Sequence, residues 1–238
     1  RTAYDAVLRL MQHDGRLVHC WRDGKGTAPA TAADYANMIA AALALHGLGN
    51  ERRCLDDALR LTDVLDRLYW HDQLGGYAFT AVDTPGLIVR TRTAQDDAVP
   101  NANATMVSCL AKLHLLTGED RFRARAEAVA TAFLADVAAA PAGHTGLMAA
   151  ALDTIALRHI VVIGEAGGEL TTALRQVSTP GALIQRFETA PDVPPGSPLA
   201  GKGMVGGRAT AYACTGPVCS APMTTAGALA EVLRQARS

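Results

Sequence analysis

Apolar residues recur at intervals of three and four through the N-terminal part of the chain, which is the period of an amphipathic helix. The pattern predicts helices over residues 4–11, 35–48 and 53–69. An Asp-Gly pair follows the first helix and a Gly-Asn pair follows the second, and both are typical turn signals. A mainly α-helical fold is therefore expected for this part of the chain.

Two helical pairs in this part of the chain repeat each other. The segment LHGLGNERRCLDDA at 45–58 aligns without a gap with LHLLTGEDRFRARA at 113–126, which predicts an array of helical hairpins. Such an array buries its apolar faces by stacking linearly or by closing into a ring. Polar clusters, one around Asp34 and one over residues 96–103, precede the first helix of each pair. Polar loops on one rim favour a partial (α/α) toroid with a central cavity.

Alternating apolar and polar positions interrupt the helical pattern in two places. The segment at 16–21 predicts a short extended piece. The segments YAFTAV at 77–82 and LIVRTR at 87–92 are separated by Asp-Thr-Pro-Gly, which predicts a β-hairpin inserted between the helical pairs. His46 and His114 occupy equivalent positions of the repeat, and we interpret both as structural.

The composition changes near residue 158, where a compact β-branched run predicts a buried strand. Predicted strands and helices then alternate, at residues 158–164, 169–176, 182–187, 208–214 and 224–238. We expect two domains, a helical-hairpin toroid portion over 1–157 and a small α/β unit with parallel strands over 158–238.

Charge and composition exclude several partners. The net charge is −1 with acids and bases interspersed, which predicts neither a nucleic-acid partner nor a membrane partner. No apolar run reaches the roughly 18 residues of a membrane span. The 5 cysteines are an odd number and scattered, which favours reduced thiols and a cytoplasmic location. Because the chain opens at Arg1 within a predicted helix, we expect a preceding segment.

Asp34 and Asp96 are the carboxylates best placed for acid and base catalysis on a sugar-like substrate. Hydrolysis of a glycoside requires two facing carboxyl groups, and epimerisation requires a base beside a carbonyl. Both residues could instead cap helices, Asp34 either as the N-cap itself or at the third helical position after Thr31. His19, next to Trp21, is predicted as a general base.

The remaining candidates would bind substrate. Arg90 and Arg92 share one face of the predicted strand and would clamp a carboxylate or phosphate, or pair with Asp96 or Asp97. Aromatic residues could stack on sugar rings or belong to the core. The predicted substrate-binding residues are Trp21, Tyr35, Arg90, Arg92, Asp97, Asn101 and Asn103.

No metal and no cofactor is predicted. Cys214 and Cys219 form a C-x4-C motif, but a structural zinc ion requires four ligands and no second pair follows. We expect two independent cysteines in preference to a zinc site or a disulfide. The glycine-rich segment 164–168 follows a predicted strand, but its spacing differs from G-x-G-x-x-G and no P-loop lysine follows.

The motifs RLVHCWRDG, ADYA, LGGYAFTAVDTPGLIVRTRTAQDDAVPNAN and GRATAYACTGPVC occur in this order. Together they resemble the C-terminal portion of the thioredoxin-domain-containing proteins of the spermatogenesis-associated protein 20 family. The resemblance extends over essentially the whole chain. It implies a helical part similar to the six-hairpin glycosidase-like toroids and the N-acylglucosamine 2-epimerases. It also implies a thioredoxin-like domain upstream in the full-length protein.

The resemblance implies a carbohydrate-active protein, epimerase/isomerase-like or hydrolase-like, with a small carbohydrate ligand and acid/base carboxylates at the toroid rim. The alternative is a non-catalytic binding or scaffold module partnered with the thioredoxin-like domain. The family's L-D-D-Y-A motif is reduced to ADYA at 33–36. The family's D-G-A-x-P-S-G-N-S motif retains Asp96, Pro100 and Asn103, but its small Ser-Gly frame is lost. Loss of that frame favours the alternative.

Overall fold

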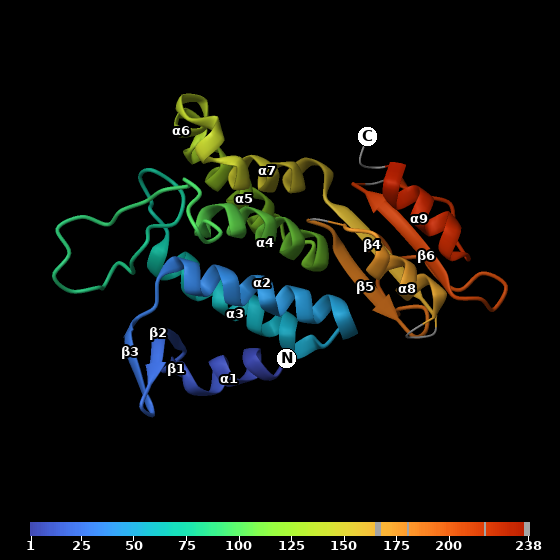
Figure 1. Cartoon of the computed structure of the whole chain (residues 1–238), viewed down its shortest axis with the longest axis horizontal. Coiled ribbons are helices and arrows are strands. Elements are labelled where there is room, and N and C mark those ends of the chain that lie inside the picture. Colours follow the sequence, from blue (N-terminus) through green and yellow to red (C-terminus); the bar gives the residue numbers. More distant parts are fainter. Residues whose placement is uncertain (165–167, 180, 217, 236–238) are drawn as a thin grey trace. The chain divides into compact units, whose positions relative to one another are not determined.

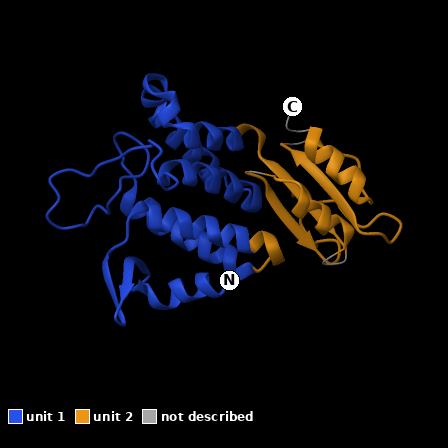
Figure 2. Ribbon diagram, in the orientation of Figure 1, with its two compact units in different colours: residues 1–45, 52–154 blue, residues 46–51, 155–238 orange. Residues whose placement is uncertain are grey.

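The computed structural model describes residues 1–164, 168–179, 181–216 and 218–235 (Figure 1). The chain divides into two compact units (Figure 2). The first contains residues 1–45 and 52–154, and the second contains residues 46–51 and 155–238. That residues 1–157 and 158–238 form two separate domains remains a prediction.

Helices dominate the first unit, as the hydrophobic pattern predicts. In chain order they are α1 (Thr2–Leu10), α2 (Ala32–Gly49), α3 (Arg52–Tyr69), α4 (Ala102–Thr117), α5 (Asp120–Ala132), α6 (Leu134–Ala139) and α7 (Thr145–Ala156), with a 3-10 turn η1 (Pro141–Gly143) before α7. The pairs α2–α3 and α4–α5 are the predicted helical hairpins (Figure 1). The mainly α fold class is confirmed.

The first helix of each pair is apolar around most of its surface, whereas α3 carries a single apolar stripe. A helix that is apolar on all sides is stable only when it is buried. Accordingly, Ile39 of α2 and Leu110 and Leu113 of α4 are fully buried. Leu61 and Leu65 of α3 pack into the same core. Helices α2 and α4 are thus the inner helices of the array.

The repeat extends to the tight turns between paired helices. His46 near the end of α2 forms a hydrogen bond between Nδ1 and the carbonyl of Glu51, at 3.1 Å. His114 near the end of α4 forms the equivalent bond to Glu119, also at 3.1 Å. Each imidazole therefore joins the two ends of its turn, which is the structural role predicted for both histidines.

A β-hairpin is inserted in the helical unit, but not at the predicted place. Strands β1 (Gln12–His13), β2 (Arg16–Arg22) and β3 (Lys25–Pro29) form an antiparallel sheet in the order β1-β2-β3. Strand β2 confirms the extended piece predicted at 16–21.

The β-hairpin predicted over 77–92 is wrong. Much of its main chain bonds elsewhere: the amide of Ala78 donates to Tyr69 at 2.9 Å and that of Val82 donates to Leu68 at 2.7 Å. In the second predicted strand the side chains of Leu87, Ile88 and Val89 are exposed, so this strand has no buried apolar face. A two-stranded hairpin without such a face is at best marginally stable. The alternating pattern belongs to an extended connection.

The second unit contains a four-stranded sheet in the order β5-β4-β6-β7. Its elements are β4 (Arg158–Ile163), α8 (Glu169–Gln176), β5 (Leu183–Phe187), β6 (Thr210–Thr215), β7 (Val218–Cys219) and α9 (Ala226–Gln235). The predicted small α/β unit is thus present. Helices α8 and α9 share one apolar core with Ile160 and Val162 on a single face of the sheet (Figure 1).

The sheet is mixed, which corrects the expectation of parallel strands. Strand β4 pairs in parallel with β5, because α8 carries the chain back between them. Strand β6 follows a long connection without a helix and pairs antiparallel with β4. The expectation of independent cysteines is also wrong: Cys214 and Cys219 are cross-strand partners in β6 and β7 and form a disulfide.

The last turn of α2 packs on strand β5 within the second unit. The side-chain amide of Asn50 donates to the Arg186 carbonyl, and the Arg186 guanidinium donates to Leu48 at 2.8 Å. Gly47 lies so close to the Ile184 carbonyl that an added Cβ would clash with it. This glycine is therefore required for the close approach of helix and strand.

We predict that Gly47→Ala lowers the free energy of unfolding by about 1–3 kcal/mol, because the new Cβ overpacks against rigid backbone. Alanine is otherwise the better helix former by about 1 kcal/mol. Gly49→Ala is the matched control, since nothing lies within 4 Å of its added Cβ. Urea unfolding measures the free energy of unfolding of both variants. Equal stability of the two would contradict the close packing.

Burial lowers the pKa of His159, whose Nε2 lies 2.8 Å from Gln185 Oε1. Below the ordinary value of about 6.5, the unfolded chain therefore binds a proton that the folded chain does not. We predict that stability is lost as pH falls from about 6.5, by at most about 1.4 kcal/mol per pH unit. Urea unfolding between pH 7.5 and 5.5 should show a flatter profile for His159→Gln than for His71→Gln.

Candidate functional site

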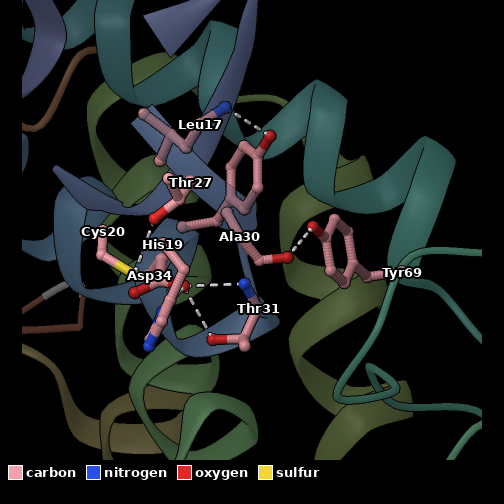
Figure 3. Close-up of polar contacts among 9 residues, drawn as sticks. Leu17, His19, Cys20, Thr27, Ala30, Thr31, Asp34 and Tyr69 are labelled. Atoms are coloured by element: carbon pink, nitrogen blue, oxygen red, sulfur yellow. Dashed lines mark hydrogen bonds and ion pairs between the residues drawn. The ribbon is translucent and has the colours of Figure 1, made fainter. Parts of the chain in front are cut away.

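The carboxylate of Asp34 lies where β2 meets the start of α2 (Figure 3). Its Oδ2 accepts from the Thr31 amide at 2.7 Å, from the Thr31 hydroxyl at 2.9 Å and from His19 Nδ1 at 2.9 Å. Since α2 begins at Ala32, Thr31 is the N-cap and Asp34 is at the third helical position. The capping-box alternative is the one that the structure adopts.

His19 remains accessible although its ring is oriented by Asp34. Its side chain is 52% exposed, against 27% for Asp34. When Nδ1 carries the proton toward the carboxylate, Nε2 is left to exchange a proton with a bound molecule. Trp21 lies two residues further along β2 on the same face as His19 and is also exposed. The structure thus brings these three predicted residues into one neighbourhood.

Tyr35 anchors this neighbourhood and is fully buried. Its hydroxyl accepts from the Leu17 amide at 2.9 Å, which ties β2 to α2. Its ring lies 5.3 Å from that of Tyr69, whose hydroxyl donates to the Ala30 carbonyl at 2.6 Å (Figure 3). Burial raises the pKa of Tyr35, so its hydroxyl stays neutral. The geometry makes it a core residue.

Asp96 lies at a different helix from the one expected. Its Oδ2 accepts from the Thr145 hydroxyl at 2.9 Å and from the Gly146 amide at 2.8 Å, at the start of α7. Asp96 precedes α4 in the chain, as expected, but the expectation that its carboxylate lies at the N-terminus of α4 is wrong, because the side chain reaches across to α7. Neighbouring Asp97 accepts from the adjacent Ala98 amide at 2.7 Å and is exposed.

Asn101 and Asn103 hold the long connection onto α4. Asn101 is the N-cap of α4, accepts from the Asn103 amide and donates to Gln95 at 3.0 Å. Asn103 is buried: its Oδ1 accepts from the Tyr77 amide at 2.7 Å, and its Nδ2 donates to Tyr77 at 3.0 Å and to Thr93 at 2.9 Å. The side-chain amide of Asn103 thus has main-chain groups as its hydrogen-bond partners.

Arg90 and Arg92 donate to main-chain carbonyls. The Arg90 guanidinium donates to Thr80 and to Leu68, both at 3.1 Å. Arg92 donates to a carbonyl at the end of α5 at 3.5 Å, and its guanidinium lies 4.4 Å from the ring centroid of Phe133. Both arginines therefore fix the long connection.

Two cavities lie near this region, and neither is lined by Asp34 or Asp96. The first, about 370 Å³, is lined by His13, Arg16, Leu17, Val18, Ala28, Pro29, Ala30, Asp83, Thr84 and Pro85. The second, about 280 Å³, is lined by Asp66, Arg67, Trp70, His71, Asp72, Gln73, Val82 and Arg90. Arg90 is thus the predicted residue that borders one of them.

Sequence reasoning missed Asp66, which lies in the second cavity. Its Oδ1 accepts from the Tyr77 hydroxyl at 2.6 Å and lies 3.4 Å from the Arg125 guanidinium. Burial raises the pKa of this carboxyl. The Arg125 guanidinium also lies 3.8 Å from the ring centroid of Trp70. Asp66 has no neighbouring motif in the sequence, so nothing there signals its burial.

The chain is similar in sequence to known proteins and in fold to a solved structure. No protein-family model matches it. Human spermatogenesis-associated protein 20 is 30% identical over 200 residues, which is 80% of this chain and 25% of that protein. The rat protein is 29% identical over 211 residues, 85% of this chain and 27% of its own length. The chain is a relative of spermatogenesis-associated protein 20.

The predicted family resemblance is thereby confirmed. The chain spans about a quarter of the length of these relatives. Among solved structures, a GH76 alpha-mannanase from Bacteroides thetaiotaomicron is similar, with a TM-score of 0.50 and 12% identity. The match covers 63% of this chain and 43% of the mannanase. At this identity the likeness shows the fold alone, an array of helical hairpins.

Two findings concern the predicted partners. In the described part of the chain, no helix combines the length and the apolar character that crossing a membrane requires. Within the same residues, no group of three or more His, Cys, Asp or Glu side chains is placed to hold a metal ion.

We predict that Asn103→Ala lowers the free energy of unfolding by about 1–3 kcal/mol, because it leaves the buried Tyr77 amide without its acceptor. Asn101→Ala removes an N-cap at the same helix and should cost about 1 kcal/mol. Denaturant unfolding of both variants measures the difference. An Asn103→Ala variant as stable as the wild type would return Asn103 to the list of candidate ligand-binding residues.

Proposed function

We propose that the chain is the carbohydrate-active part of a six-hairpin glycosidase-like protein, and that the His19–Asp34 pair is its acid–base group. The supporting observation is the 2.9 Å contact of the half-exposed imidazole with a carboxylate that the N-terminus of α2 holds in place. A carboxylate at Nδ1 fixes the tautomer that leaves Nε2 free to take a proton. The ligand class is a small carbohydrate.

Proton transfer of the epimerase or isomerase kind suits this pair better than glycoside hydrolysis. Hydrolysis requires two carboxyl groups across the scissile bond, about 5–9.5 Å apart. Asp96 is engaged at the start of α7, whereas Asp34 is engaged at the start of α2. Epimerisation instead requires one base beside a carbonyl carbon. Trp21, on the same face of β2, would offer an apolar surface to a sugar ring.

A second candidate function is a non-catalytic binding or scaffold module that contacts a thioredoxin-like domain. The observation in its favour is that Asp34 and Asp96 each accept hydrogen bonds from the residues that open a helix. Helix capping stabilises the fold and needs no chemistry. A cytoplasmic location, and the absence of a nucleic-acid partner, remain predictions from composition.

We predict that a sugar or sugar phosphate raises the Tm of the wild type but not that of His19→Gln. His114→Gln is the matched control, because His114 is also bonded through Nδ1 but lies at the turn between α4 and α5. Turnover of the same ligand should fall by about 10²–10⁴-fold in His19→Gln, which is the usual contribution of a general base. Thermal-shift screening and proton exchange at the sugar carbon measure the two effects.

The outcomes separate the two candidates. Binding that survives in His19→Gln, with no turnover by the wild type, supports the non-catalytic module. If no sugar shifts the Tm of any variant, the carbohydrate proposal fails. Asp34→Asn tests orientation, because the amide can still accept from Thr31 but no longer stabilises a protonated His19. Its turnover should fall while its Tm stays close to that of the wild type.

A further inference from the structure

The disulfide of the second unit lies at the edge of its sheet. Cys214 of β6 and Cys219 of β7 are paired in the antiparallel register, and β7 is the outermost strand. The two residues differ in access: Cys214 is only 5% exposed, whereas Cys219 and its neighbour Val218 are exposed. A thiolate from another molecule can therefore approach from the Cys219 side.

This bond contributes little to holding the sheet together. The two cysteines are separated by only 5 positions in the sequence, and closing a short loop restricts the unfolded chain least. Strand β6 pairs with β4 along its whole length, from Thr210 to Thr215. It is also bridged to Met223, through amide–carbonyl bonds of 2.7 and 2.9 Å with Ala211. Opening the disulfide leaves these contacts in place.

The two sulfurs are held near each other independently of their bond. The Ser220 amide donates to the Ala213 carbonyl at 2.8 Å, and the Ala213 amide donates to the Ser220 hydroxyl at 3.1 Å. These bonds lie immediately beside the cysteine pair on both strands. The reduced form therefore keeps the two thiols apposed, so that the bond can open and close without unfolding.

We infer that Cys214–Cys219 is a thiol–disulfide exchange site whose reaction partner is a protein dithiol. A partner thiolate attacks Cys219 Sγ, the S–S bond breaks, and the electron pair leaves on Cys214 Sγ, which takes a proton. The partner's second thiol then attacks the mixed disulfide and releases Cys219. Two electrons and two protons pass to this chain, and the partner becomes the disulfide. The inference is independent of the carbohydrate proposal.

The test uses the full oxidised chain and a thioredoxin whose second active-site cysteine is replaced by serine, which traps the mixed disulfide. We expect a covalent one-to-one complex on a non-reducing gel, linked through Cys219 in peptide mass spectrometry. Cys219→Ser should abolish it completely. Cys214→Ser should also abolish it, because a lone thiol at 219 offers no disulfide to attack. Cys20→Ser, at another exposed cysteine, should leave the yield unchanged.

A second measurement tests whether reduction leaves the fold intact. Circular dichroism and the Tm of the wild type, before and after reduction by intact thioredoxin, should agree closely, because β6 keeps its pairing with β4. The inference is overturned if the complex forms through Cys214 or Cys20. It is equally overturned if the folded chain resists thioredoxin while the guanidinium-unfolded chain is reduced. Alkylation that finds five thiols in the air-oxidised chain would also overturn it.

Discussion

The buried hydroxyls of Tyr35 and Tyr69 hold the helical unit together at the point where its candidate site lies. One accepts from the Leu17 amide, and the other donates to the Ala30 carbonyl. The two rings pack against each other, so strand β2, the start of α2 and the end of α3 are fixed by one contact. A buried main-chain group without a partner is costly, which makes this arrangement specific. His19 is carried to Asp34 by the strand that Tyr35 anchors.

Polar side chains of the region form hydrogen bonds mainly with main-chain amides and carbonyls. Asn103 binds both the amide and the carbonyl of Tyr77, and Arg90 binds two carbonyls. A long connection without helix or strand must satisfy its peptide groups in this way. Density of polar residues in a sequence is therefore as characteristic of a fixed loop as of a binding site. Exposure of the imidazole distinguishes His19 from the buried Asn103.

The chemistry that we propose for the second unit differs from that proposed for the first. Its sheet joins a parallel pair, β4 and β5, to an antiparallel edge, β6 and β7. Strands β4 and β6 lie inside the sheet, whereas the disulfide joins β6 to the edge strand β7, where another molecule can reach it. Because β6 stays paired with β4 when the disulfide at the β7 edge is reduced, the proposed thiol–disulfide exchange leaves the fold intact.

The sequence by itself determined the helices predicted over 4–11, 35–48 and 53–69, the internal repeat, and the strands predicted at 16–21 and 158–164, because local periodicity fixes which face of an element can be buried. It also carried the motifs of the family resemblance. Only the tertiary structure decided that Asp96 serves α7, that the alternating segment at 77–92 forms no strands, and that Cys214 meets Cys219. Each of these depends on partners distant in sequence or on strand register, and no local pattern records which distant group a side chain will reach.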